Sequence, residues 1–199
     1  MEEQRVHIFV DFWNLQLSIN AHRPHNYRLD WRKLSPYLIR QTEHVLGTPL
    51  RFEGSTVYLS YNPATPQGKK LRHWGHNVLA RFPGMQVVAK ERKAKHPPRC
   101  PHCHRIIDRC PYCGAKMIGT VEKGIDTAMV TDMIKLAWEG AWDVAILISS
   151  DRDFIPVVEF LHNKGLKIIN VHFPPQGAEL ARHCWGSIDL SQHLDALSR

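Results

Sequence analysis

The sequence has no long apolar stretch. Its longest uninterrupted apolar run is Val144-Ala145-Ile146-Leu147-Ile148, whereas a helix that crosses a membrane needs roughly 20 residues. The first five residues also lack the basic start and the apolar region of a secretory signal. We therefore expect a protein without a membrane partner, located in the cytoplasm.

A Walker-type phosphate loop is missing too, because Gly-x4-Gly-Lys-Ser/Thr does not occur. The 199 residues are 43% hydrophobic and 23% charged, which is typical of a globular protein and argues against disorder as the main state. At roughly 150 residues per domain, this length predicts one domain with a small insertion. The net charge of +7 weakly favours a polyanionic partner.

Strand-like and helix-like segments alternate along most of the chain. Apolar and β-branched runs predict strands at residues 6–10, 55–61, 85–89, 144–149 and 166–172. Apolar residues at helical spacing predict helices at residues 31–46, 71–79, 126–139 and 153–164, and a helix with a polar tail at residues 177–199. This alternation predicts an α/β fold, a three-layer sandwich with a central, mainly parallel sheet. We expect a single domain over residues 1–199, an insertion at residues 95–120 and no internal repeat.

Two of the predicted strands end in aspartate. Asp11 follows the first strand, and Asp151 and Asp153 follow the strand at 144–149. Ligands of open α/β sheets bind beyond the carboxyl ends of the strands, at the point where strand order reverses. If these two strands are neighbours, the three carboxylates converge there. On the helix that precedes the strand at 144–149, Asp126 and Asp132 fall within the apolar arc, where an unpaired carboxylate costs several kcal/mol.

Each carboxylate also has a purely structural interpretation. Asp126 and Asp153 could be helix caps. Asp11 and Asp151 could stabilise turns at the strand ends. Their joint occurrence at two strand ends and on one helix face favours a functional cluster.

A cluster of carboxylates calls for a cation, because the charges repel one another and raise one another's pKa. Mg²⁺ prefers oxygen ligands and keeps waters that a phosphate or a nucleophile can replace. Such a site activates water and stabilises the charge that develops on a phosphodiester. Without a phosphate loop, hydrolysis of a nucleic-acid backbone fits better than use of a nucleoside triphosphate.

Three segments carry a more specific signal. They are Asp11-Phe12-Trp13-Asn14, Lys123-Gly124-Ile125-Asp126 with Asp132 six residues on, and Ser149-Ser150-Asp151-Arg152-Asp153-Phe154-Ile155-Pro156. In this order they resemble the signatures of the NYN domain (LabA-like), a branch of the PIN-like nucleases. The resemblance implies a metal-dependent ribonuclease, and the preference for RNA rests on it alone. It also implies residue roles: Mg²⁺ or Mn²⁺ at Asp11, Asp126, Asp151 and Asp153, Asn14 as a polar helper and Asp132 as a supporting acid.

Four of the five cysteines form two Cys-x2-Cys pairs, Cys100 with Cys103 and Cys110 with Cys113. Two such pairs supply the four thiolates of a structural zinc site, so we expect a zinc ribbon within the insertion. A redox pair, an iron–sulfur cluster, or a histidine (His102 or His104) in place of one thiolate are the alternatives. Cys184 is expected to have no role.

Basic residues near residue 70 and around the insertion are the expected nucleic-acid contacts. The candidates are Lys69, Lys70, Arg72, Arg92, Lys93, Lys95, Lys123 and Arg152. Such cations suit phosphate contacts, and the insertion returns directly to Lys123 beside the predicted metal site. The alternative is a solvated basic surface that only keeps the insertion soluble. Trp13 could line a substrate groove or pack below it, and Trp74 could stack on single-stranded bases or belong to the core.

The leading hypothesis is a divalent-metal-dependent ribonuclease, favoured as an endonuclease, that hydrolyses single-stranded RNA at the aspartate cluster. A non-catalytic RNA-binding adaptor is the main alternative, and a phosphohydrolase for small phosphate esters is the third. The basic insertion argues against the third, because a small substrate needs no extended cationic surface. A homodimer and a regulatory protein partner are both compatible with the leading hypothesis.

Overall fold

The computed structural model describes residues 3–199, and within them six parallel strands form one sheet in the order β3-β2-β1-β6-β7-β8. These strands are Gln4–Asp11 (β1), Leu50–Tyr61 (β2), Met85–Glu91 (β3), Val144–Ile148 (β6), Lys167–His172 (β7) and Gly186–Asp189 (β8). The expected fold class is confirmed: an α/β sandwich with a central parallel sheet between two helical layers.

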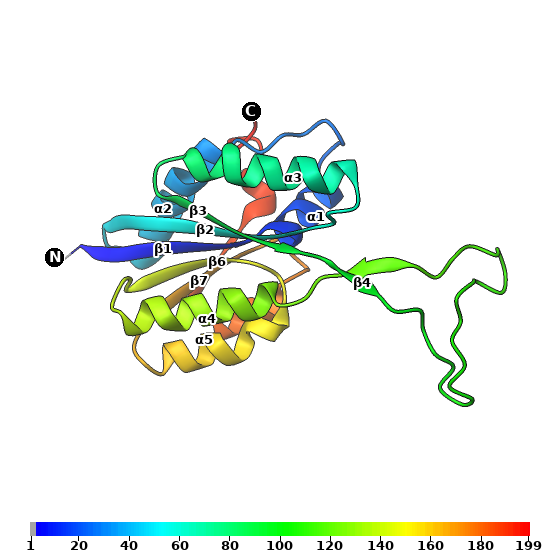
Figure 1. Ribbon diagram of the computed structural model, residues 1–199. Helices are drawn as coiled ribbons and strands as arrows, with labels where there is room; N and C mark the ends of the chain where they lie inside the picture. The colour runs from blue at the N-terminus through cyan, green and yellow to red at the C-terminus, as the bar shows by residue number, and fades with distance from the viewer. Residues whose placement is uncertain (1–2) are drawn as a thin grey trace.

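Helices cover both faces of the sheet (Figure 1). One layer holds Phe12–His22 (α1), Trp31–Leu46 (α2) and Pro66–Asn77 (α3), and the other holds Ile125–Trp138 (α4), Ile155–His162 (α5) and Ala178–His183 (α6). Short 3-10 turns lie at Leu79–Arg81 (η1), Arg152–Phe154 (η2) and Leu190–His193 (η3). No helix within residues 3–199 is long and apolar enough to span a membrane.

Alternate residues of the central strands pack into two separate apolar clusters. In β1, Ile8 belongs to the cluster under α1, α2 and α3, and Phe9 belongs to the cluster under α4, α5 and α6. Because both faces of the sheet are covered, a central strand such as β6 is apolar at every position.

Local signals in the sequence set the ends of α2 as expected. The Asp30 side chain accepts a hydrogen bond from the Arg32 N–H, and the helix ends at Gly47 in the left-handed conformation with φ of 65°. The helix predicted around residues 71–79 begins earlier, at Pro66, because the Thr65 hydroxyl caps it by accepting from the Gly68 N–H.

The sequence analysis did not predict one helix and one strand of the α/β sandwich itself. Helix α1 starts directly after β1, where Asp11 caps it, and it buries Phe12, Leu15 and Ile19. Strand β8 extends the sheet beyond β7. The expectation of a polar tail is also wrong, since Leu194 and Leu197 are fully buried and the Leu197 carbonyl accepts from the Asp30 N–H at 2.8 Å.

Strand order reverses between β1 and β6. From β1 the chain builds the sheet outward through β2 and β3, and it then crosses to the other side of β1 for β6, β7 and β8. The carboxyl ends of β1 and β6 therefore flank the place where open α/β sheets bind ligands.

The chain between β3 and α4 leaves the body of the fold. Two short strands, Lys93–Lys95 (β4) and Gly119–Val121 (β5), form an antiparallel ladder. Residues 96–118, which we call the arm, lie between them and extend away from the sheet and its helices (Figure 1).

Candidate active site

Asp11 lies at the carboxyl end of β1 and is only 7% exposed. One carboxylate oxygen accepts from the Asn14 N–H at 3.1 Å, so the residue caps α1, a structural role that differs from the turn suggested by the sequence. The other oxygen accepts from the Ser149 hydroxyl at 3.3 Å, which ties the end of β1 to the end of β6. The cap therefore fixes Asp11 at the reversal point of the strand order.

The loop after β6 brings two more carboxylates to the same edge of the sheet. The Asp151 N–H donates to the Ser149 hydroxyl at 3.1 Å, and the Asp153 N–H donates to the Asp151 carboxylate at 2.9 Å. The Asn14 side-chain oxygen accepts from the Ser150 N–H at 2.9 Å, so α1 holds this loop directly. Asp153 does not cap α5, because Asp151 caps η2 and α5 begins at Ile155.

Asp126 reaches this edge of the sheet from the first turn of α4. Gly124, with φ of 77°, is the N-cap residue and makes no side-chain cap bond, so the interpretation of Asp126 as a cap is wrong. The Lys90 ammonium donates to the Gly124 carbonyl at 2.7 Å, which fixes the start of the helix. Asp126 is exposed rather than buried, whereas its neighbour Ile125 in the same turn is buried in the core.

The charges of these residues act on one another. The pKa of Asp11 is raised to about 6, mainly by burial and further by the charges of Asp126 and Glu122, while the hydrogen bonds from Asn14 and Ser149 act in the opposite direction. Burial also raises the pKa of Asp126, and the charges of Glu122, Asp151 and Asp153 add to that shift. We call these five residues, Asp11, Glu122, Asp126, Asp151 and Asp153, the acidic cluster.

Glu122 is the member that sequence reasoning missed. Its carboxylate accepts a hydrogen bond from the Ser60 hydroxyl and forms a 3.7 Å ion pair with Arg92. Arg92 also donates to the Ser60 hydroxyl at 2.9 Å and lies 4.9 Å from the ring centre of Trp13. The signal in the sequence was its position four residues before Asp126, directly before the Lys-Gly-x-Asp segment.

The NYN domain family profile matches residues 5–191, almost the whole chain. The chain belongs to the NYN domain family. Membership indicates a nuclease-like hydrolase with RNA as the class of substrate, and the family's PIN-like nuclease relatives generally use divalent metals. The NYN resemblance is thereby confirmed, while the LabA-like subfamily stays a prediction.

The fold of this NYN domain occurs in a solved structure as well. A crystal structure of a protein of unknown function from Vibrio parahaemolyticus aligns with a TM-score of 0.55 and 16% identity over 96% of each chain. At that identity, the likeness concerns the fold alone. No curated protein matches the sequence significantly.

Asp132 lies beneath the acidic cluster of the NYN domain instead of in it. Its carboxylate accepts from the buried Tyr58 hydroxyl at 2.9 Å, and the Tyr58 backbone is paired with Asp11 across β1 and β2. Burial and the Asp132 contact raise the pKa of Tyr58, so the phenol stays a hydrogen-bond donor. Asp132 therefore holds the strand next to the one that ends in Asp11.

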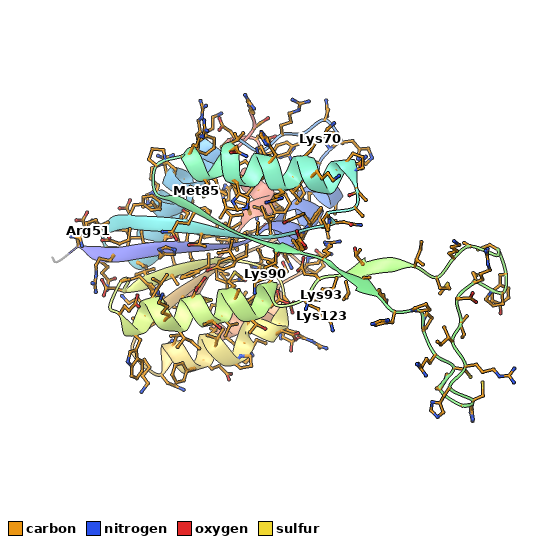
Figure 2. The ribbon with its side chains drawn as sticks, in the orientation of Figure 1. Arg51, Lys70, Met85, Lys90, Lys93 and Lys123 are labelled. Atoms are coloured by element: carbon orange, nitrogen blue, oxygen red, sulfur yellow. The ribbon has the colours of Figure 1, made fainter. Side chains whose placement is uncertain are left out.

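The predicted basic contacts are spread over several elements. Lys93 and Lys123 lie near each other where the arm leaves the domain, together with Lys90, which was not among the candidates (Figure 2). Lys69 and Arg72 line a cavity of about 520 Å³ beside α3, together with Tyr61, Pro63, His73, His76 and Asn77. Lys70 is exposed on α3, Lys95 is exposed in β4 and Arg152 is exposed in η2. Arg92 differs, since it is half-buried and paired with Glu122.

The two tryptophans for which a groove and the core were both considered, Trp13 and Trp74, pack against the apolar core.

The two cysteine pairs form separate turns on the arm. In the first, the backbone N–H groups of Cys103 and His102 lower the pKa of the Cys100 thiol. In the second, those of Cys113 and Tyr112 do the same for Cys110. Cys184 differs, because burial raises the pKa of its thiol to about 12. Each pair therefore favours one thiolate, which is the form that binds metal.

Within residues 3–199, no group of three or more Cys, His, Asp or Glu side chains is arranged as a metal site. Zinc at the cysteines and Mg²⁺ or Mn²⁺ at the acidic cluster therefore stay predictions. The donor chemistry fits both ions. Among the described residues, no ion pair with Lys or Arg is seen for Asp11, Asp126, Asp151 or Asp153, and hard oxygen donors of this kind suit a divalent cation.

Proposed function

We propose that this NYN domain is a divalent-metal-dependent ribonuclease whose reaction takes place at the acidic cluster. The observation that carries the proposal is a set of carboxylates gathered at the strand-order reversal, where burial and the charges of the neighbouring acids raise the pKa of Asp11 and of Asp126. Like charges gathered at a ligand-binding edge do not favour stability, and a buried carboxylate such as Asp11 is costly without a partner, which favours a functional role.

Asp11 and Asn14 have different roles in the proposed site. Asp11 is held in one orientation by Asn14 and Ser149, so its carboxylate is pre-organised as the inner ligand. Asn14 also holds the loop that carries Asp151, which sets the distance between the two acids. A bound Mg²⁺ or Mn²⁺ would supply a water of lowered pKa and offset the charge on the reacting phosphate.

Basic surfaces flank this site on the side where a strand of RNA would have to lie. Lys90, Lys93 and Lys123 stand at the base of the arm, and Lys69 and Arg72 line the cavity at the carboxyl end of β2. Single-stranded RNA fits these separated cations, because its backbone can bend between contacts that a duplex would hold at fixed spacing.

A panel of four substrates tests the proposal. Labelled single-stranded RNA, hairpin RNA, single-stranded DNA and a chromogenic phosphate monoester are each incubated with Mg²⁺, with Mn²⁺ and with EDTA. We expect product from single-stranded RNA with a divalent ion and none with EDTA, with activity restored when the ion is added back. Salt-sensitive RNA binding without product under any ion would support the adaptor instead, and hydrolysis of the monoester alone would support the phosphohydrolase.

We also propose that the arm binds one structural zinc ion through Cys100, Cys103, Cys110 and Cys113. The support is the matched local geometry of the two pairs, each of which aims backbone N–H groups at its first sulfur. Four thiolates leave no open position for a water, so this ion would organise the arm and take no part in hydrolysis.

Zinc content checks this assignment. Protein purified with zinc in the medium should release about one zinc ion per chain when its thiols are modified with a mercurial reagent and the metal is read with a chromogenic chelator. Cys103→Ser and Cys113→Ser should each lose that zinc. Cys184→Ser is the matched control, since this thiol lies in the body of the domain and should leave the zinc in place. Zinc retained by both arm variants would contradict the site.

A further inference from the structure

The arm contains a short repeat that the sequence analysis did not find. Residues 99–103 and 109–113 both read Arg-Cys-Pro-x-Cys. The hydrogen bonds repeat as well: the Cys100 N–H donates to the Arg105 carbonyl at 2.9 Å, and the Cys110 N–H donates to the Ala115 carbonyl at 2.8 Å. His104 and Gly114 occupy equivalent places, and both have positive φ. The arm is thus a pair of equivalent turns.

The variable position of each turn lies between its two cysteines. It is His102 in the first turn and Tyr112 in the second. The Tyr112 side chain is 96% exposed, the highest value among the exposed large hydrophobic residues. A turn whose other positions are set by the cysteines and their backbone bonds presents this ring to solvent with nothing packed against it.

The charge of the arm indicates what could cover that ring. Asp108 is the only acidic residue in residues 96–118, against the four cations Arg99, Arg105, Arg109 and Lys116. The arm's described hydrogen bonds stay within it, so these cations are not engaged by the acids of the domain body. An aromatic ring among cations suits a nucleic-acid strand, whose phosphates pair with the cations and whose unpaired bases stack on the ring.

The chain returns from the arm directly to the acidic cluster. Strand β5 follows the arm and ends at Val121, and the next residue is Glu122. Lys93 and Lys123 lie at the base of the arm, between the body of the domain and the arm itself (Figure 2). A nucleic-acid strand bound at the cluster can therefore meet these cations on its way to the arm.

We propose that Tyr112 stacks on an unpaired base of the RNA strand, at a fixed number of nucleotides from the bond that is cleaved. The inference rests on the proposed RNA substrate and adds a second contact that recognises the strand away from the acidic cluster. Tyr112 stacks on any base, because every base has an aromatic face. It therefore selects for an unpaired nucleotide and for length, not for sequence.

Binding of a labelled 20-nucleotide single-stranded RNA tests the stack. The parent is the Asp11→Asn protein in Mg²⁺ buffer, so that cleavage does not disturb the measurement by fluorescence anisotropy. Tyr112→Ala should weaken binding by about tenfold, and Tyr112→Phe and Tyr112→Trp should keep it within about twofold. Trp138→Ala is the control. This ring is exposed as well, at 77%, but it lies at the opposite end of α4 from Asp126.

A scan with single abasic sites locates the base. One abasic position should weaken binding by the parent protein and have no further effect on Tyr112→Ala, the signature of a shared contact. Equal binding by Tyr112→Ala and its parent, or an equal loss in Tyr112→Phe, overturns the inference. If RNA binding depends on Tyr112 but the unmodified protein cleaves no RNA with any divalent ion, the ribonuclease proposal is overturned and the stack is retained.

Discussion

Replacing Asp11 with asparagine is expected to reduce metal-dependent RNA cleavage by about 1,000-fold, which corresponds to about 4 kcal/mol of activation free energy. Asp11 is the most buried acid of the cluster, and both of its oxygens are oriented by hydrogen bonds from different elements. An amide keeps the size and can still accept from the Asn14 N–H, so the α1 cap and the fold should persist. What it removes is the negative charge that a divalent ion requires.

The measurement compares single-turnover cleavage rates of labelled single-stranded RNA in saturating Mn²⁺, with binding measured in parallel. RNA binding should change by less than about threefold, since the cluster itself repels phosphate. Asp189→Asn is the matched control. Asp189 also ends a strand and caps the next turn through the Ser191 N–H, but β8 is the edge strand and lies far from the reversal point. Full activity in Asp11→Asn, or an equal loss in Asp189→Asn, would remove the acidic cluster from the reaction.

The positions of the acids could be predicted because they follow from periodicity and topology. An apolar run that ends in Asp11 and another that ends before Asp151 must bring both residues to one edge of a parallel sheet if the strands are neighbours. Helical spacing of the apolar residues added Asp126, on the helix that precedes the second of these strands. The positions of Asp11, Asp126 and Asp151 could be predicted without knowledge of any particular contact between distant side chains.

Other parts of the site depend on contacts that no local pattern encodes. Glu122 belongs to the cluster because Ser60 on β2 and Arg92, between β3 and β4, hold its carboxylate. A structural and a functional role are also compatible in Asp11, since the residue caps α1, which the sequence did not predict, and belongs to the cluster at the same time. In the sequence analysis, a structural role and a functional role of Asp11 were alternatives.

The missed elements share a physical cause. Helix α1 starts at the residue where β1 stops, so its three buried residues were not separated from the preceding apolar run by any turn signal. The C-terminal residues are mostly polar, and the burial of Leu194 and Leu197 depends on their packing into the core beneath α1, α2 and α3. Composition over such short segments is a weaker determinant than tertiary packing.

Acid is expected to destabilise the protein through His7. This residue lies on β1 and is 7% exposed, and burial lowers its pKa to about 4, while the carboxylates of Asp132 on α4 and Glu53 on β2 act in the opposite direction. Its ring nitrogen is 3.0 Å from the Thr56 hydroxyl. Because the folded protein binds this proton more weakly than the unfolded chain does, stability is complete above the ordinary pKa of 6.5 and is lost as the pH falls toward 4.

Replacing His7 with glutamine should therefore reduce the acid sensitivity. An amide can keep the contact with Thr56 and takes up no proton. Between pH 7 and pH 4.5, the free energy of unfolding in urea should fall by about 2 kcal/mol more in the unmodified protein than in His7→Gln. The raised pKa values of Asp11 and Asp126 have the opposite sign, but they are common to both proteins and cancel in the difference. His76→Gln, an exposed histidine on α3, is the control. Parallel pH profiles for His7→Gln and the unmodified protein would show that His7 is not the group whose protonation opposes folding.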